Sequence, residues 1–176
     1  MSFDLELKGR TALVTGGTKG LGAAVVASLH DAGVKVIAVA RSVPSDAPEG
    51  ISYIEGDLLS AAGCTAAVNT VLEKFGGVDI IVNVLGGSSA PSGGFAVLDE
   101  QEWENALNQN LMSAVRIDRG LLPAMLVKKS GVIVHVTSIQ NKLPLPESTT
   151  AYAAAKAALS TYSVSALKSA FLLTFS

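Results

Sequence analysis

The stretch Arg10-Thr-Ala-Leu-Val-Thr-Gly-Gly-Thr-Lys-Gly-Leu-Gly22 decides the fold that this sequence predicts. Its first six residues form a short apolar run typical of a buried strand, and the glycines then allow a sharp turn. Apolar residues at a spacing of four predict a helix over 20–32. This order aims the first amides of a helix at the end of a strand, where they can bind a phosphate group. Alone, the same glycines are also compatible with an ordinary tight turn.

Strand-like and helix-like segments alternate along the rest of the chain. Short apolar runs predict strands at 34–40, 51–55, 78–84 and 132–136, and longer segments predict helices at 60–75, 99–107, 110–127 and 151–169. Such alternation indicates right-handed β-α-β units and one parallel sheet covered by helices. Ligands of such sheets bind at the carboxyl ends of the strands, and Asp57, Asn83 and Ser138 fall at those ends.

Composition narrows the classes of function. A chain of 176 residues with net charge −2 predicts a single domain over 1–176 and gives no electrostatic reason to expect nucleic acid or a membrane as partner. Cys64 is the only cysteine, and neither His30 nor His135 has a second ligand at metal spacing, so we expect no metal site. No apolar run reaches the ~20 residues that span a bilayer. The N-terminus lacks the features of a signal peptide, so we expect a cytoplasmic protein.

Tyr152 and Lys156 are the candidate catalytic pair. They are four residues apart in Tyr-Ala-Ala-Ala-Lys, so a helix places them on one face, one turn apart. A neighbouring ammonium favours the ionised form of a phenol, which suits the phenol for moving a proton. Ser138 follows the fifth strand, from which its hydroxyl can hold a carbonyl oxygen in front of that phenol. The alternatives are a solvated helix face for the pair and an ordinary strand-end hydroxyl for Ser138.

Together these features resemble the short-chain dehydrogenase/reductase family. The resemblance extends from about residue 7 to residue 163 and includes the Thr-Gly-x-x-x-Gly-x-Gly turn and the Tyr-x-x-x-Lys pair. Ser138 also lies fourteen residues before Tyr152. Further matches at strand ends and in a helix are Asp57, Asn83, Gly86 and Asn110. The resemblance implies an α/β fold of three layers, with a doubly wound, Rossmann-like parallel sheet of strand order 3-2-1-4-5.

The resemblance also implies an oxidoreductase that transfers a hydride between a nicotinamide cofactor and a carbonyl or alcohol. It implies Tyr152 as the general acid–base, Lys156 as the residue that binds the nicotinamide ribose, and Ser138 as the residue that orients the substrate oxygen. Asn110 matches an asparagine that supports a water chain to the lysine, and a helix cap is its alternative. The implied cofactor-binding residues are Thr15, Gly16, Thr18, Lys19, Gly20, Leu21, Gly22, Arg41, Ser42, Asp57, Leu58, Asn83, Gly86, Tyr152 and Lys156.

Charge indicates which nicotinamide cofactor to expect. An acidic residue at the end of the second strand would bind the 2′-hydroxyl of NAD, whereas this chain has Ala40-Arg41-Ser42 there. Lys19 in the glycine turn can reach the same position. Two cations without a nearby acid favour a 2′-phosphate, so we expect NADP(H) rather than NAD. An Arg41 that is solvated or stacked on adenine is the alternative.

The chain departs from the family pattern at two places. Leu85 stands where the family has alanine beside the adenine, and the tail 164–176 fits the family poorly. The family continues with a sixth strand, a Pro-Gly turn, a substrate lid and a seventh strand. We therefore expect a C-terminally truncated domain, whose fifth strand is an apolar edge covered in part by 170–175 or by another subunit.

Substrate and assembly are less closely specified by the sequence. Apolar residues beside the site favour an apolar or aromatic carbonyl or alcohol, or else pack these loops onto the body; they are Ile139, Leu143, Pro144, Leu145, Pro146 and the segment 88–95. The resemblance implies a homodimer or homotetramer through helices 99–127 and 151–169. The second hypothesis, from another class, is a catalytically silent, truncated dinucleotide-binding or oligomerisation module.

Overall fold

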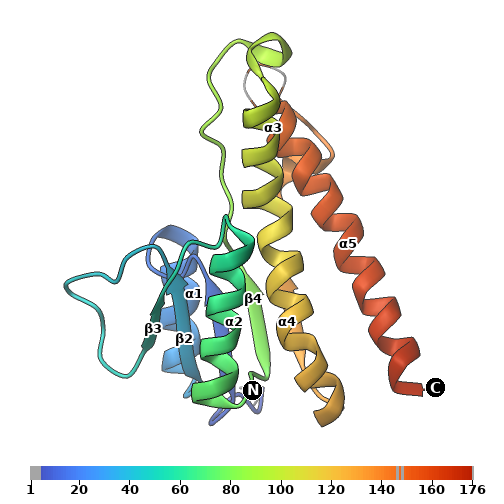
Figure 1. Cartoon of the computed structure of the whole chain (residues 1–176). Coiled ribbons are helices and arrows are strands. Elements are labelled where there is room, and N and C mark those ends of the chain that lie inside the picture. Colours follow the sequence, from blue (N-terminus) through green and yellow to red (C-terminus); the bar gives the residue numbers. More distant parts are fainter. Residues whose placement is uncertain (1–4, 146, 148, 176) are drawn as a thin grey trace.

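The computed structural model describes residues 5–145, 147 and 149–175 (Figure 1). In this part of the chain, five strands form one parallel sheet in the order β3-β2-β1-β4-β5, so the predicted fold class and strand order are confirmed. The strands are Thr11–Thr15 (β1), Lys35–Ala40 (β2), Ser52–Glu55 (β3), Ile80–Asn83 (β4) and Val132–His135 (β5). Each predicted strand exists, and the observed ends differ by only one or two residues.

Helices connect the strands, as the alternation predicts. They are α1 (Gly20–Asp31), α2 (Ala61–Phe75), α3 (Glu100–Leu107), α4 (Ser113–Lys128) and α5 (Thr150–Phe175). The predicted start of α3 is confirmed, because the Asp99 carboxylate accepts a hydrogen bond of 2.9 Å from the Glu102 amide. Ser60 caps α2 in the same way through the Gly63 amide. In the described part of the chain, none of the helices has the length and apolarity that crossing a membrane requires.

A π-helical turn, Asn108–Met112, joins α3 to α4 at the place where the sequence predicts that Asn110 opens or continues a helix. Figure 1 shows α3 and α4 as consecutive parts of one long rod, with α5 alongside it. This turn, α3 and α4 all lie close to α5. A π-turn widens the helix by one residue and is frequent at functional sites.

The core has two parts, one on each face of the sheet. On one face, Leu13 and Ile81 pack against α2 and α4 through Val71 and Ile117. On the other face, residues of β1, β2 and β4 pack against α1 through Val26. Both parts are almost wholly aliphatic, which is the pattern expected of parallel strands buried on both faces.

β5 lies at one edge of this sheet. The exposed fractions of Val132 and Val134 are 54% and 44%, so the predicted apolar edge is confirmed and described residues leave it open. The helix predicted to end at residue 169 is longer, because the tail continues α5 without a break to Phe175. Pro146 and Ser176, about which the sequence makes predictions, lie outside the described residues, as do residues 1–4.

We predict that Ile81→Ala costs about 2–5 kcal/mol of unfolding free energy, because it leaves a cavity beneath α4. Ile81 is 0% exposed and lies on β4, which has a strand on either side of it. Val127→Ala is the control, since Val127 is 85% exposed, and it should change stability by less than about 0.5 kcal/mol. Urea unfolding of the three chains measures both changes. An equal loss in the two variants would contradict this assignment of the core.

Candidate active site

Three polar residues form a row across the carboxyl ends of β1, β4 and β5. Thr15 pairs with Asn83, and Asn83 pairs with His135, in the register of the sheet. They occupy the face of the sheet that carries Leu13 and Ile81 two residues earlier, because side chains alternate along a strand. Thr15 Oγ1 accepts hydrogen bonds from the Val84 and Leu85 amides at 3.1 and 3.2 Å, and so shapes the loop after β4.

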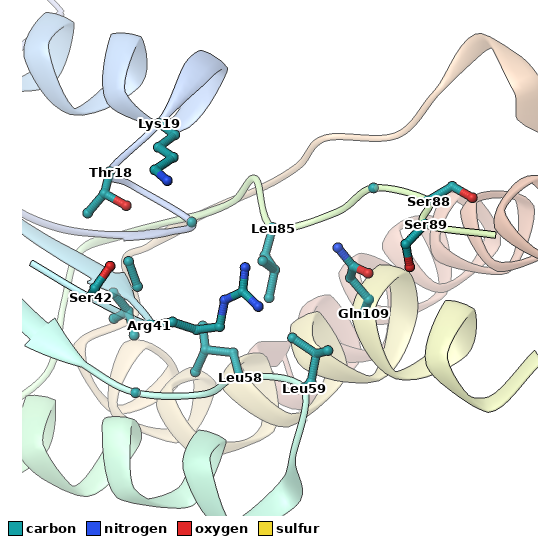
Figure 2. Close-up of a pocket in the computed structure, with 15 residues that line it drawn as sticks. Thr18, Lys19, Arg41, Ser42, Leu58, Leu59, Leu85, Ser88, Ser89 and Gln109 are labelled. Carbon is teal, nitrogen blue, oxygen red and sulfur yellow. The ribbon is translucent and has the colours of Figure 1, made fainter. Parts of the chain in front are cut away.

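A cleft of about 420 Å³ opens at this edge of the sheet (Figure 2). Six residues predicted to bind a cofactor line it, namely Gly16, Thr18, Lys19, Arg41, Ser42 and Leu58. Figure 2 shows the Lys19 and Arg41 side chains entering the cleft from opposite sides. The cleft therefore carries two cations at the end where the sequence predicts a phosphate.

The start of α1 suits an anion. Within the described residues, Lys19 at its N-cap makes no side-chain capping hydrogen bond, whereas α2 and α3 are capped by Ser60 and Asp99. The first amides of α1 are thus not occupied by a capping side chain, and they lie beside the two cations. A dinucleotide phosphate fits this donor set.

The glycine turn is packed too tightly for side chains. A Cβ atom at Gly22 would collide with the Gly16 carbonyl oxygen, and one at Gly17 would lie 2.9 Å from Ala38 Cβ. Gly16 has a φ of 68°, in the left-handed region. These glycines bring the α1 N-terminus close to the sheet, which leaves the space above the turn for a ligand.

Lys156 is buried, and its ammonium sits at the end of β5. Only 2% of the residue is exposed, and Nζ donates a hydrogen bond of 2.8 Å to the carbonyl oxygen of Val136, the residue after β5. The Tyr152 ring centroid lies 5.9 Å from Nζ, so the predicted pair does lie together. Burial lowers the pKa of Lys156, because water stabilises the charged form better than the protein interior does.

Asn110 links the π-turn to the loop after β4. Its Oδ1 accepts from the Gly87 amide and its Nδ2 donates to the Gly87 carbonyl oxygen, each at 2.9 Å. A Cβ atom at Gly86 would lie 2.8 Å from Lys156 Nζ and 3.0 Å from Asn110 Oδ1. Gly86 therefore lies against both side chains, and the methyl group of an alanine there would displace them.

Ser138 begins the turn that follows β5. Its Oγ accepts a hydrogen bond of 3.2 Å from the Gln140 amide. Because that bond uses a lone pair of the oxygen, the Ser138 hydroxyl proton is free of it and can be donated to another acceptor. Ser138, Tyr152 and Lys156 thus come from the two segments that meet at the end of β5.

Other predicted residues lie beside the cleft rather than in its lining. Asn83 is buried, and its Nδ2 donates to Asp118 Oδ1 at 2.8 Å. Asp57 accepts from the Leu59 amide at 3.1 Å and shapes the loop after β3. Ser88 and Ser89, from the segment 88–95 that the sequence places beside the site, do line the cleft. Sequence reasoning missed other lining residues next to predicted ones: Leu59, Leu85, Gly87 and Gln109. Of these, only Leu85 carried a signal, as a departure from the family pattern.

The model of the short chain dehydrogenase family matches residues 10–169. The chain belongs to this family. The match covers both the glycine turn and the helix that carries Tyr152 and Lys156. Separate motifs first indicated this family, and the match now shows it for most of the chain.

Relatives in the family agree with this assignment. The chain is 34% identical over 151 residues to the uncharacterised oxidoreductase YvrD of Bacillus subtilis, covering 82% of this chain and 57% of that protein. It is 32% identical over 143 residues to the 3-oxoacyl-[acyl-carrier-protein] reductase FabG of Vibrio cholerae, covering 77% and 57%. The chain thus spans a little more than half the length of these curated relatives.

A solved relative has a closely similar fold. The L-sorbose reductase of Gluconobacter frateurii, solved with NADPH and L-sorbose, superposes with a TM-score of 0.89 at 29% identity. The superposition covers 97% of this chain and 68% of that one. The chain therefore shares the oxidoreductase fold of the family over nearly all of its length.

We predict that Lys156→Met changes how stability depends on pH. Burial lowers the Lys156 pKa from its ordinary 10.5, so between the two values the unfolded state binds more protons than the folded state. The lysine's contribution to stability therefore rises with pH in that window. The free energy of unfolding of the native chain, relative to Lys156→Met, should therefore increase as the pH rises toward 10.5. Urea unfolding at several pH values measures it, and a constant difference would contradict the prediction.

Proposed function

We propose that this protein is an NADP(H)-dependent oxidoreductase that interconverts a carbonyl compound and its alcohol, with Tyr152 as general acid–base. The observation that carries the proposal is the buried Lys156 ammonium beside the Tyr152 ring, next to a cationic cleft with an uncapped helix N-terminus. The loop after β4 borders the cleft, and its Gly86 lies next to Lys156 Nζ. Asn110 holds the same loop by accepting a hydrogen bond from the Gly87 amide.

The proton chemistry follows from these positions. The nicotinamide, when bound, supplies the hydride for reduction or accepts it in oxidation. As the carbonyl carbon gains the hydride, the C=O π bond breaks and its oxygen takes the proton of the Tyr152 hydroxyl. Lys156 stabilises the resulting phenolate, which then regains a proton from solvent. Ser138 donates its free hydroxyl proton to the same substrate oxygen and holds it in place.

Two cations support NADP(H) as the cofactor. Lys19 and Arg41 both line the cleft at the end of β2, where a 2′-phosphate would meet them. The related L-sorbose reductase was solved with NADPH. Thr18, Ser42 and the amides of α1 would bind the phosphates.

Apolar surface beside the pair supports an apolar or aromatic substrate. Phe95, Ile139 and Leu143 are all exposed on the two loops after β4 and β5. These loops are joined, because the Glu147 carbonyl oxygen accepts hydrogen bonds from the Gly93 and Gly94 amides. Exposed aliphatic and aromatic side chains on linked loops can enclose an apolar group next to the reacting carbonyl.

One observation favours a second candidate, a catalytically silent dinucleotide-binding or oligomerisation module. Val132 and Val134 are exposed on one face of β5. An open apolar edge of this kind can pair with a second copy of the chain in a domain that binds a dinucleotide but catalyses no reaction. A homodimer or homotetramer fits either function. NADPH binding without turnover on a panel of carbonyl compounds would favour the silent module.

We predict that Tyr152→Phe lowers carbonyl reduction by about 10²–10⁴-fold, because the substrate oxygen loses its proton donor. NADPH affinity should change little, because the ring and Lys156 remain. Turnover of NADPH with the carbonyl panel and fluorescence titration of NADPH measure the two properties. Tyr53→Phe, on β3, is the matched control. Full activity in Tyr152→Phe would remove this residue from the mechanism.

A second prediction concerns the cofactor. Arg41→Ala should weaken NADPH binding by about 10–100-fold, since a hydrogen bond between charged groups is lost. NADH has no 2′-phosphate, so its affinity should stay nearly constant. Lys35→Ala, at the opposite end of β2, is the control and should leave both affinities unchanged. Fluorescence titration measures all of them, and an equal loss for the two cofactors would argue against a 2′-phosphate contact.

A further inference from the structure

A buried polar cluster lies behind the candidate active site, between β4, β5, α4 and α5. It consists of Asn83, Asp118, His135, Tyr162 and Ser163, and is called the Asp118 cluster below. Only 1% of Asp118 is exposed, yet the residue is a carboxylic acid in the middle of α4. A buried carboxylate is costly unless donors surround it. Sequence reasoning assigned His135 no role and did not single out Asp118. The cluster is therefore visible only in the tertiary structure.

Three donors from three elements converge on Asp118. Asn83 of β4 donates to Oδ1 at 2.8 Å. His135 Nε2 of β5 lies 2.8 Å from Oδ2, and the Tyr162 hydroxyl of α5 donates to Oδ2 at 3.0 Å. An ionised carboxylate only accepts, so the His135 proton lies on Nε2. Burial, together with the Asp118 charge, raises the pKa of Tyr162, which keeps its hydroxyl protonated as a donor.

His135 makes a second bond to α5. Its Nδ1 lies 2.9 Å from Ser163 Oγ, a hydroxyl that can donate or accept, and its ring meets the Tyr162 ring edge-on at 5.6 Å. α5 is therefore attached to β5 and α4 through two consecutive residues. Together with the bond from Lys156 to Val136, this makes two attachment points separated by two helical turns.

The two attachment points are directly connected through the backbone. Val136, whose carbonyl oxygen holds Lys156, is the residue after His135. The Val136 amide donates to the Asn83 carbonyl oxygen at 3.0 Å, so Asn83 contacts both the carboxylate and the strand end. Ser163 follows Lys156 by seven residues and so lies on the same face of α5. A shift of the cluster would move the lysine or its acceptor.

We propose that the Asp118 cluster fixes the position of α5 along β5 and thereby holds the Lys156 ammonium against the Val136 carbonyl oxygen at the end of β5. Asp118, His135 and Tyr162 are positioning residues that act through Lys156. Their importance for turnover depends on the proposed function, whereas their effect on Lys156 does not. The buried Asp118 carboxylate has a structural role, because its hydrogen bonds join α4 to β4, β5 and α5, the elements around the lysine.

The cluster also contains a serine, a histidine and an aspartate in hydrogen-bond contact, the composition of a hydrolytic triad. Ser163, however, lies inside α5, where backbone amides are used by the helix itself. A nucleophilic serine needs free amide donors for the oxyanion that it forms. The positioning role is therefore the one that this geometry supports.

The test measures the exposure of Lys156 directly. The rate of its reductive methylation, followed by peptide mass spectrometry, is compared with that of exposed Lys35 in the same molecule. Tyr162→Phe removes one donor from Asp118 and keeps the ring, while Tyr53→Phe is the matched control outside the cluster. Lys156 should react about three- to tenfold faster in Tyr162→Phe and at an unchanged rate in Tyr53→Phe. Asp118→Asn should have a larger effect, and Tyr162→Phe alone decides the test if Asp118→Asn does not fold.

NADPH affinity and turnover are measured on the same variants. Faster Lys156 methylation with weaker NADPH binding, confined to the cluster variants, supports the proposal even if no carbonyl compound is reduced. In that case only the proposed function fails. Equal methylation rates and equal NADPH affinities in Tyr162→Phe and Tyr53→Phe would overturn the positioning role. If those two variants still reduce a carbonyl compound, the proposed function stands although the positioning role does not.

Discussion

The hydrogen bond from the Lys156 ammonium to the Val136 carbonyl oxygen is the interaction around which the rest of the site is arranged. A buried cation needs partners, because the interior stabilises charge far less than water does. Gly86, which has no side chain, leaves space beside Nζ. The Asn110 side chain makes its hydrogen bonds with the Gly87 backbone and so does not fill that space. Two of the three ammonium protons are thus not used by Val136 and can be donated to other acceptors.

The polar row at the strand ends divides the structural work among three residues. Thr15 shapes the loop after β4, which borders the cleft, while Asn83 and His135 turn to Asp118. One row of residues in the sheet therefore shapes the loop beside the cleft and also holds α4 and α5 in place through Asp118. This arrangement explains how α5, a helix joined to β5 only through a turn and a long loop, keeps a defined position along the strand.

The cofactor end and the substrate end of the site differ in how they are built. Regular elements, β1, β2 and the start of α1, present the glycine turn, Lys19 and Arg41, so the cofactor end rests on a rigid frame. The substrate end consists of two loops joined through the Glu147 carbonyl oxygen, with several exposed apolar side chains. Loops of this kind adapt to a ligand more readily than strand ends do.

The sequence by itself determined the strands, the helices, their order, the glycine turn and the Tyr152–Lys156 pair, because each depends on residues close together in the chain. It also indicated that a helix begins at Asp99 and that β5 is an apolar edge. Only the tertiary structure decided that Lys156 is buried, that Asn110 sits in a π-turn bonded to Gly87, and that Asn83 faces Asp118. Only the structure likewise showed that Gln109 lines the cleft. These features depend on residues 20 or more positions apart, whose contacts follow from packing between elements and leave no local pattern in the chain.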